Sequence, residues 1–282
     1  MSMIYDGFLF FNELDLLEIR LNELSEVVDK FVLVECLLTH ASKEKPYYFE
    51  ENKDRFKKFL HKIIHVKVDD RPDIKPRKAR HGLTHNRHEM EWFQRDCISR
   101  GFDNCKPDDI VMISDIDEIP TVESIKACKN ELDKKDELVS FDQFLFYYFL
   151  NGLCVNSDGT PVNWSGTTAC KYRSYPGAQA IRNTKGKNRL RIKNGGWHFS
   201  YLGGPDSIAK KIESYSHAEF DNDIIKNRVR IQECIDKGVD LFGRAGKPRQ
   251  FYVKIDSNFP IYLQKNIEKY KSLIKEETIK NE

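Results

Sequence analysis

The segment from Asp109 to Pro120 constrains the fold of this chain more than any other stretch. It begins with four consecutive apolar residues, Ile110 to Ile113, a run that suits a strand buried on both faces of a parallel sheet. Polar and acidic side chains follow this run, and Pro120 then allows a helix to begin at Thr121. The segment therefore predicts a central strand of an α/β sheet that ends in an acidic turn.

This acidic turn contains Ser114, Asp115, Asp117 and Glu118. In open α/β sheets, ligands bind just beyond the carboxyl ends of the strands. Two carboxylates one residue apart at such a place can share a divalent cation, and hard cations prefer oxygen ligands, phosphate oxygens included. An acidic turn that only closes a strand is the alternative. The position after a buried strand favours a site for a divalent cation at Asp115 and Asp117.

Strand and helix patterns alternate three times before this segment. Asn12 is expected to cap the first helix, with Asp15 as its capping-box partner. Such alternation requires right-handed crossovers and predicts an α/β fold with a Rossmann-type, mostly parallel central sheet. The expected strands are Ile4–Phe11, Phe31–Val34 and Ile63–Val68, and the expected helices start at Leu14 and span Tyr47–Leu60 and Thr84–Ser99.

The second half of the chain has a different character. One long strand is expected over Leu138–Leu150, followed by a hairpin signal at Asn151-Gly152 and a small-residue loop at Trp164–Thr167. Residues 171–193 include Lys and Arg but no Asp or Glu. Helices are expected at Ser207–Ser216 and Asp223–Lys237. Without repeats or low-complexity linkers, we expect a single domain.

Composition excludes several classes of function. The 46 basic and 44 acidic residues give a net charge of +2, which argues against nucleic acid as a partner. Seven cysteines without Cys-x-x-Cys pairs indicate buried thiols in a reducing compartment. The N-terminus does not read as a signal peptide, and no apolar window is long enough for a membrane span. We therefore expect a chain without a membrane anchor, in the cytoplasm or otherwise soluble in the host cell.

Four stretches of the sequence form long motifs, at Phe11–Leu21, Val32–Glu35, Ser114–Pro120 and Gly196–Ser200. Together they resemble glycosyltransferase family 17. The resemblance extends from about Met3 to about Glu219, and it implies a GT-A fold, a UDP-sugar donor, Mn²⁺ or Mg²⁺ and an inverting mechanism. It also implies N-acetylglucosamine as the transferred sugar and a glycan, on a glycoprotein or a polysaccharide, as the acceptor. The resemblance further implies a nucleotide-binding half at about 1–120, an acceptor-side half at about 121–240 and a peripheral segment at 241–282.

Transfer from a nucleotide sugar expels a diphosphate, so the site must supply positive charge. Asp115 and Asp117 are therefore the expected metal ligands, with Asp115 also in reach of ribose. His198 is expected to complete the metal site or to contact the sugar, since imidazole can join a carboxylate-rich site, and His217 is the alternative. The expected donor-binding residues are Asn12, Glu13, Glu35, Arg87, Ser114, Asp115 and Trp197.

Several of these assignments have structural alternatives. Arg87 could lie on a solvated helix face, and Glu13 and Glu35 could be caps or loop carboxylates. Trp197 could be a core residue, beside a His198 that is hydrogen-bonded within the core.

An inverting transfer also needs a carboxylate base within reach of the acceptor hydroxyl, on the face opposite the diphosphate. No acid occurs between Asp158 and Asp206. We expect Asp206, which follows a Gly-Gly-Pro turn, to be this base, and the alternative is a helix cap. The other candidate catalytic carboxylates are Glu118, Asp142 and Glu219.

Two other classes of function stay open. A nucleotidyltransferase acting on sugar phosphates would share the sheet and the metal, but it should have a Gly-rich basic loop near the N-terminus, which Phe8–Glu13 is not. A non-catalytic glycan-binding module would bind glycans without metal or nucleotide.

Overall fold

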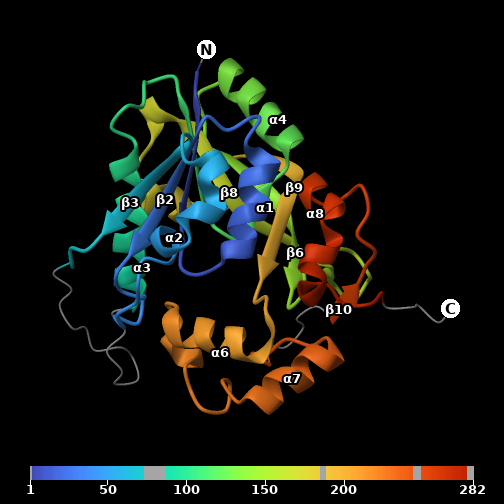
Figure 1. Cartoon of the computed structure of the whole chain (residues 1–282). Coiled ribbons are helices and arrows are strands. Elements are labelled where there is room, and N and C mark those ends of the chain that lie inside the picture. The colour runs from blue at the N-terminus through green and yellow to red at the C-terminus, as the bar shows by residue number, and fades with distance from the viewer. Residues whose placement is uncertain (1, 73–86, 185–188, 244–248, 278–282) are drawn as a thin grey trace.

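The computed structural model describes residues 2–72, 87–184, 189–243 and 249–277, and its strands form one mixed sheet (Figure 1). The main path of the sheet is β10-β7-β6-β8-β4-β1-β2-β3, with β9 beside β6 and β5 beside β9. The strands are β1 (Ile4–Leu9), β2 (Lys30–Cys36), β3 (Ile63–Val68), β4 (Ile110–Asp115), β5 (Glu118–Pro120), β6 (Val139–Tyr147), β7 (Gly152–Val155), β8 (Asn163–Lys171), β9 (Leu190–Ser200) and β10 (Arg249–Tyr252).

Helices connect these strands and cover both faces of the sheet. The α-helices are α1 (Leu14–Leu24), α2 (Tyr48–Glu51), α3 (Arg87–Asp96), α4 (Val122–Lys134), α5 (Ala178–Asn183), α6 (Gly204–Ser214), α7 (Arg228–Lys237) and α8 (Ile261–Lys265). Short 3-10 helices are η1 (Lys53–Phe59), η2 (Cys97–Gly101), η3 (Tyr172–Ser174), η4 (Ala218–Phe220) and η5 (Ile267–Leu273). Within the described residues, no helix combines the length and the apolar character needed to cross a membrane.

The pairing of the strands confirms the predicted α/β class. β1 runs parallel to both β2 and β4, and β2 runs parallel to β3. In the second half, β8 runs antiparallel to β4 and β6, whereas β9 runs parallel to β6. The sheet therefore has a Rossmann-type parallel half and a mixed half.

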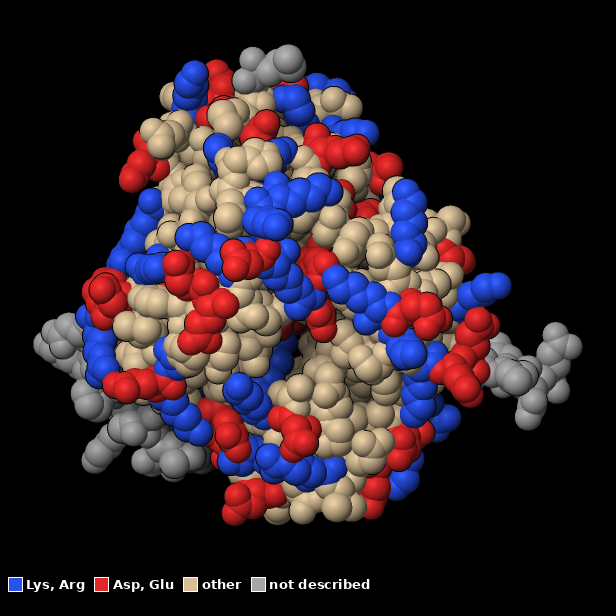
Figure 2. Space-filling view, viewed as in Figure 1, with Lys and Arg blue, Asp and Glu red and all other residues tan. Residues whose placement is uncertain are grey.

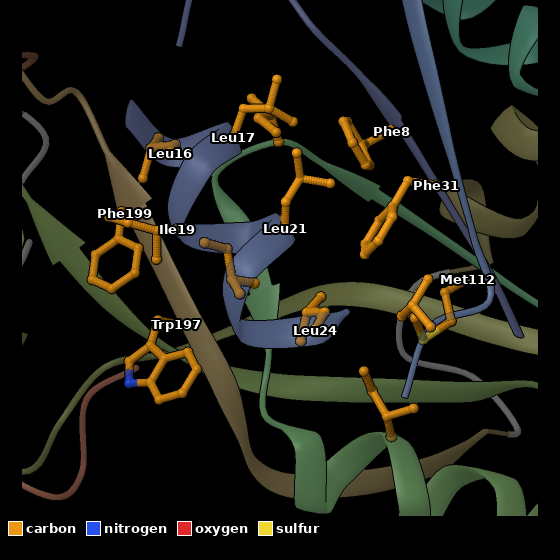
Figure 3. Close-up of a cluster of buried hydrophobic side chains, with 14 of the residues drawn as sticks. Phe8, Leu16, Leu17, Ile19, Leu21, Leu24, Phe31, Met112, Trp197 and Phe199 are labelled. Carbon is orange, nitrogen blue, oxygen red and sulfur yellow. The ribbon is translucent and has the colours of Figure 1, made fainter. Parts of the chain in front are cut away.

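Strand β4 is buried on both faces, as its apolar run predicts. Ile110 and Met112 belong to the core that α1 covers, whereas Val111 and Ile113 belong to the core formed with η2 and α5. Figure 3 shows α1 lying over the first of these cores, with Leu21 turned toward Phe31 of β2. Helices on both faces leave only the ends of the parallel strands open to a ligand.

Several local predictions need correction. The helix predicted to begin at Thr121 begins one residue later, at Val122, and Thr121 is its N-cap, because Thr121 Oγ1 accepts a hydrogen bond from the Ser124 amide at 3.0 Å. Asn12 does not cap α1: Glu13 takes the N-cap position, and no side chain caps the helix. The predicted helix over residues 47–60 divides into α2 and η1. The predicted loop at 164–167 is part of β8, where Gly166 lies so close to Gln143 of β6 that any Cβ would clash.

Two further expectations have mixed outcomes. All seven cysteines are free, as predicted, and six of them are buried. The predicted helix over residues 84–99 begins in the structure at Arg87, because residues 84–86 lie outside the described part, and it passes into η2 after Asp96. Helices α6 and α7 form a smaller layer below the sheet, packed on the ends of β6 and β7 (Figure 1).

A buried ion pair joins the first helix to the acidic turn. Arg20 of α1 and Asp6 of β1 are both fully buried, and the guanidinium donates to the two carboxylate oxygens at 2.7 and 2.6 Å. The same guanidinium donates to the Glu118 carbonyl at 2.9 Å, to the Ile116 carbonyl at 3.3 Å and to Ser114 Oγ at 2.5 Å. Arg20 therefore fixes the backbone of the acidic turn against α1.

We predict that Asp6→Ala lowers the free energy of unfolding by about 3–5 kcal/mol, because it leaves the Arg20 charge buried without its counter-ion. Urea unfolding followed by circular dichroism measures this loss. The control is Asp70→Ala at the exposed Asp70–Arg100 pair, where the loss should stay below about 1 kcal/mol. Equal losses in the two variants would contradict the importance of the Asp6–Arg20 pair.

Candidate functional site

A pocket of about 500 Å³ opens at the carboxyl ends of β1, β2 and β4. Its sheet side includes Phe11 after β1, Leu38 after β2 and Asp115 at the end of β4, and its opposite wall comes from α6 and the segments that follow it. Figure 2 shows the surface hollowed between the sheet and the α6–α7 layer. This is the edge of an α/β sheet at which ligands usually bind.

Asp115 lies at the end of β4 between two arginines. Arg95 of α3 donates to its Oδ1 and Arg182 of α5 donates to its Oδ2, both at 3.1 Å. Burial opposes ionisation of Asp115, but the two guanidinium groups outweigh it and hold the pKa below its usual value. Asp115 is therefore ionised at neutral pH, and 36% of its side chain stays exposed toward the pocket.

Asp117 lies in the turn after β4 and faces the α6 layer. Its Oδ2 accepts a hydrogen bond from Lys211 Nζ at 2.9 Å, and its Oδ1 lies 3.5 Å from His198 Nε2. Burial again opposes ionisation, yet the charge of Lys211 lowers the pKa of Asp117. The structure thus brings Asp117 and His198 together, and it adds Lys211, which the sequence did not single out.

Glu118 lies behind these two carboxylates and is fully buried. Its Oε1 accepts from Trp164 Nε1 at 2.7 Å, and Arg182 donates to both of its oxygens, at 2.7 and 2.9 Å. Its Oε2 also accepts from the Asp115 amide at 2.9 Å. Because these bonds occupy both oxygens, the structure does not support Glu118 as a reacting carboxylate. Glu118 instead fixes the backbone at Asp115.

Arg182 connects the acidic turn to α5 and was missed in the sequence. It is 4% exposed, and it also donates to the Gly166 carbonyl at 2.6 Å. Residues 171–193 have a surplus of basic residues without acids, so at least one of them could be expected to pair with a distant acidic turn. That charge pattern was the available signal.

Two predicted donor-binding residues after β1 differ in position. Glu13 lines the pocket, and its Oε2 accepts from the amides of Phe11 at 3.2 Å and Asn12 at 3.0 Å. Asn12 does not line the pocket. Ser114 is fully buried under Arg20 and cannot reach a nucleotide.

Glu35 at the end of β2 is also fully buried, which contradicts a ribose contact in this structure. Its carboxylate accepts from the Phe49 amide, with Oε1 at 3.1 Å, and Oε2 lies 3.1 Å from His65 Nε2. Glu35 therefore holds the start of α2 against β3. This position agrees with the alternative that Glu35 is a structural loop carboxylate.

Three further predicted residues also lie outside the pocket lining. Arg87 pairs with Asp221 at 2.6 Å. Trp197 packs in the main core, and its Nε1 donates to the Asn258 carbonyl at 2.9 Å. Asp206 is 85% exposed and pairs with Arg228 of α7. Its position contradicts a role as the base, because α6 turns it toward α7 rather than into the pocket.

Among the described residues, the alternative candidates Asp142, His217 and Glu219 do not contact Asp115 or Asp117 through any hydrogen bond or ion pair. Asp142 pairs with Arg191 at 2.7 Å and does not line the pocket. His217 does line the pocket, but its Nδ1 bonds Glu219 at 2.9 Å rather than Asp115 or Asp117. The acidic side chains that line the pocket are Glu13, Glu91, Asp115, Asp117 and Asp240.

Solved structures with similar chain traces are distant. A 4-diphosphocytidyl-2C-methyl-D-erythritol synthase from Anaerococcus prevotii has 10% identity and a TM-score of 0.36, over 68% of this chain and 87% of that chain. The inositol-1-phosphate CTP transferase from T. maritima has 9% identity and a TM-score of 0.35, over 98% and 99%.

Sequence comparison gives a firmer result. The chain is 26% identical to the β-1,4-mannosyl-glycoprotein 4-β-N-acetylglucosaminyltransferases of Rattus norvegicus and Homo sapiens, over 93% of its own length. It spans 53%, about half, of the length of these relatives. The family model for glycosyltransferase family 17 matches residues 1–278. This chain belongs to glycosyltransferase family 17.

Proposed function

We propose that this glycosyltransferase moves N-acetylglucosamine from a UDP-sugar to a hydroxyl group of a glycan, with inversion at the sugar carbon. Family membership supports glycosyl transfer over nucleotidyl transfer and over a glycan-binding module. The names of the relatives support the sugar and a mannosyl-glycoprotein type of acceptor. The observation that carries the proposal is the position of Asp115 and Asp117, at the end of β4 in the pocket.

The residues around Asp117 fit a divalent cation. Asp115 and Asp117 offer carboxylate oxygens, and the ring nitrogen Nε2 of His198 lies 3.5 Å from Asp117 Oδ1. Asp115, Asp117 and His198 would hold Mn²⁺ or Mg²⁺, which would supply positive charge toward a diphosphate. Lys211 already contacts Asp117, so a bound cation would share that carboxylate with the ammonium group or displace it.

Basic side chains from three elements can also face an anionic donor. Lys211 of α6, Arg95 of α3 and Lys45 in the segment between β2 and α2 all line the pocket. Burial opposes protonation of Lys211, but Asp117 and Glu13 raise its pKa, so it carries a full charge at neutral pH. Fixed positive groups in a water-poor site stabilise charge that develops on a leaving diphosphate.

The far end of the pocket suits an acceptor sugar. Tyr201, Phe220 and Phe242 line it and belong to the small core of the α6–α7 layer. Aromatic walls with a few polar groups are typical of sites for small organic ligands. Asp240 lines the same end, and we propose it as the base in place of Asp206.

We predict that Asp117→Asn weakens Mn²⁺-dependent binding of UDP by at least about 100-fold, because loss of a ligand should exceed the usual effect of losing an outer-shell contact. Isothermal titration of UDP with and without Mn²⁺ measures this. The exposed Asp103 provides a matched control, and Asp103→Asn should bind as the wild type does. Metal-dependent binding that is equally tight in both variants would refute the site.

Arg182→Lys tests the positioning of Asp115. A lysine keeps the charge but cannot donate the fork of hydrogen bonds to Glu118 and Asp115. We expect Mn²⁺–UDP binding about 10–100-fold weaker, with Arg173→Lys at the exposed pair with Asp108 as the control. Unchanged binding in Arg182→Lys would show that Asp115 keeps its position without the fork.

The base is tested by two matched substitutions. Asp240→Asn should lower the rate of transfer by about 10²–10⁴-fold while UDP binding stays unchanged, as expected for the loss of a positioned base. Asp206→Asn should transfer at close to the wild-type rate, because its carboxylate faces Arg228. The reverse pattern would restore Asp206 to the role predicted from the sequence.

A further inference from the structure

A second group of metal-binding side chains lies at the rim of the pocket, apart from Asp115 and Asp117. It consists of His88 in α3, His217 just before η4 and Glu219 within η4. One ligand atom from each residue lies within 4.8 Å of the others. Side chains separated by about 130 positions in the sequence therefore present two imidazoles and a carboxylate to one point.

The internal geometry of this group suits a shared ion. His217 Nδ1 lies 2.9 Å from Glu219 Oε1. The rings of His88 and His217 are 5.1 Å apart and nearly perpendicular, at 89°. The three side chains are between 38% and 52% exposed, so water or a ligand can complete the coordination.

An outer-shell carboxylate is present beside His88. His88 Nδ1 lies 3.4 Å from Glu91 Oε2, and the other oxygen of Glu91 accepts from Arg95 at 2.7 Å. Metal-binding histidines usually donate their second ring N–H to such a carboxylate, which fixes the orientation of the ring. Glu91 therefore orients His88 so that Nε2 is left for the metal.

The start of α3 and the segment after α6 are held together by protein contacts, without a bound metal ion. Arg87, next to His88, pairs with Asp221 at 2.6 Å, and Lys226 pairs with the same carboxylate at 2.8 Å. Arg87 also donates to the Tyr215 carbonyl at 3.5 Å. These contacts hold the start of α3 against the segment that carries His217 and Glu219.

We propose that His88, His217 and Glu219 form a transition-metal site that prefers Zn²⁺ and is separate from the Asp115–Asp117 site. Two imidazoles and one carboxylate with an open position match the usual ligand set of zinc, whereas Mg²⁺ prefers oxygen ligands. The ion would link α3 to the segment after α6 at the mouth of the pocket. This proposal does not depend on the sugar or the acceptor.

The test is titration of the full chain with Zn²⁺ by calorimetry in excess Mg²⁺, which competes for the proposed Mn²⁺ or Mg²⁺ site at Asp115 and Asp117. Wild type should bind one Zn²⁺, and Co²⁺ in its place should give the visible absorption of an imidazole site. His217→Ala and His88→Gln should each weaken Zn²⁺ binding by more than about 100-fold, and Glu91→Gln by about 10–100-fold. The controls are His61→Gln, at an exposed histidine, and Asp117→Asn.

The proposal stands if Zn²⁺ binding is weakened in the His88, His217 and Glu91 variants but not in the controls. The His88 and His217 variants should also lose the rise in thermal unfolding temperature that Zn²⁺ gives the wild type. It is overturned if the wild type binds no Zn²⁺, or if the His88 and His217 variants bind it as tightly as the wild type. Loss of Zn²⁺ binding in Asp117→Asn alone would also overturn it, because the ion would then lie at the acidic turn.

Discussion

The buried contact between Arg20 and Asp6 is the interaction on which the candidate site depends. Taking two charges out of water costs several kcal/mol per ion unless each is well paired. The hydrogen bonds that Arg20 donates to Asp6 and to the backbone carbonyls of Ile116 and Glu118 offset this cost. Strand β1, helix α1 and the acidic turn after β4 therefore form one unit, and Asp115 and Asp117 project from a backbone that is already fixed.

Basic side chains from three helices determine the ionisation state of the two carboxylates. Arg95 of α3 and Arg182 of α5 bind Asp115, while Lys211 of α6 binds Asp117. These charges keep both carboxylates ionised in spite of burial. The same groups make the pocket attractive to a diphosphate.

Local sequence patterns were enough for the class of fold, and they led to the two acids that line the pocket at the end of β4. The apolar run of β4 predicted a strand buried on both faces, and the acids after it are in the pocket. The partners of these acids depend on which helices fold over the edge of the sheet, and no local pattern carries that information. Arg182, Lys211 and the outward position of Asp206 are of this kind. Arg20 did leave a signal, since it interrupts the apolar stripe of α1 between Leu17 and Leu24.

The most direct measurement is a crystal structure with UDP and Mn²⁺, with anomalous scattering recorded at the manganese edge. The account predicts an anomalous peak in contact with Asp115 and Asp117, and diphosphate density between that peak and Arg95 or Lys211. Diphosphate bound elsewhere, or a nucleotide bound in the pocket with no manganese at the acidic turn, would contradict it.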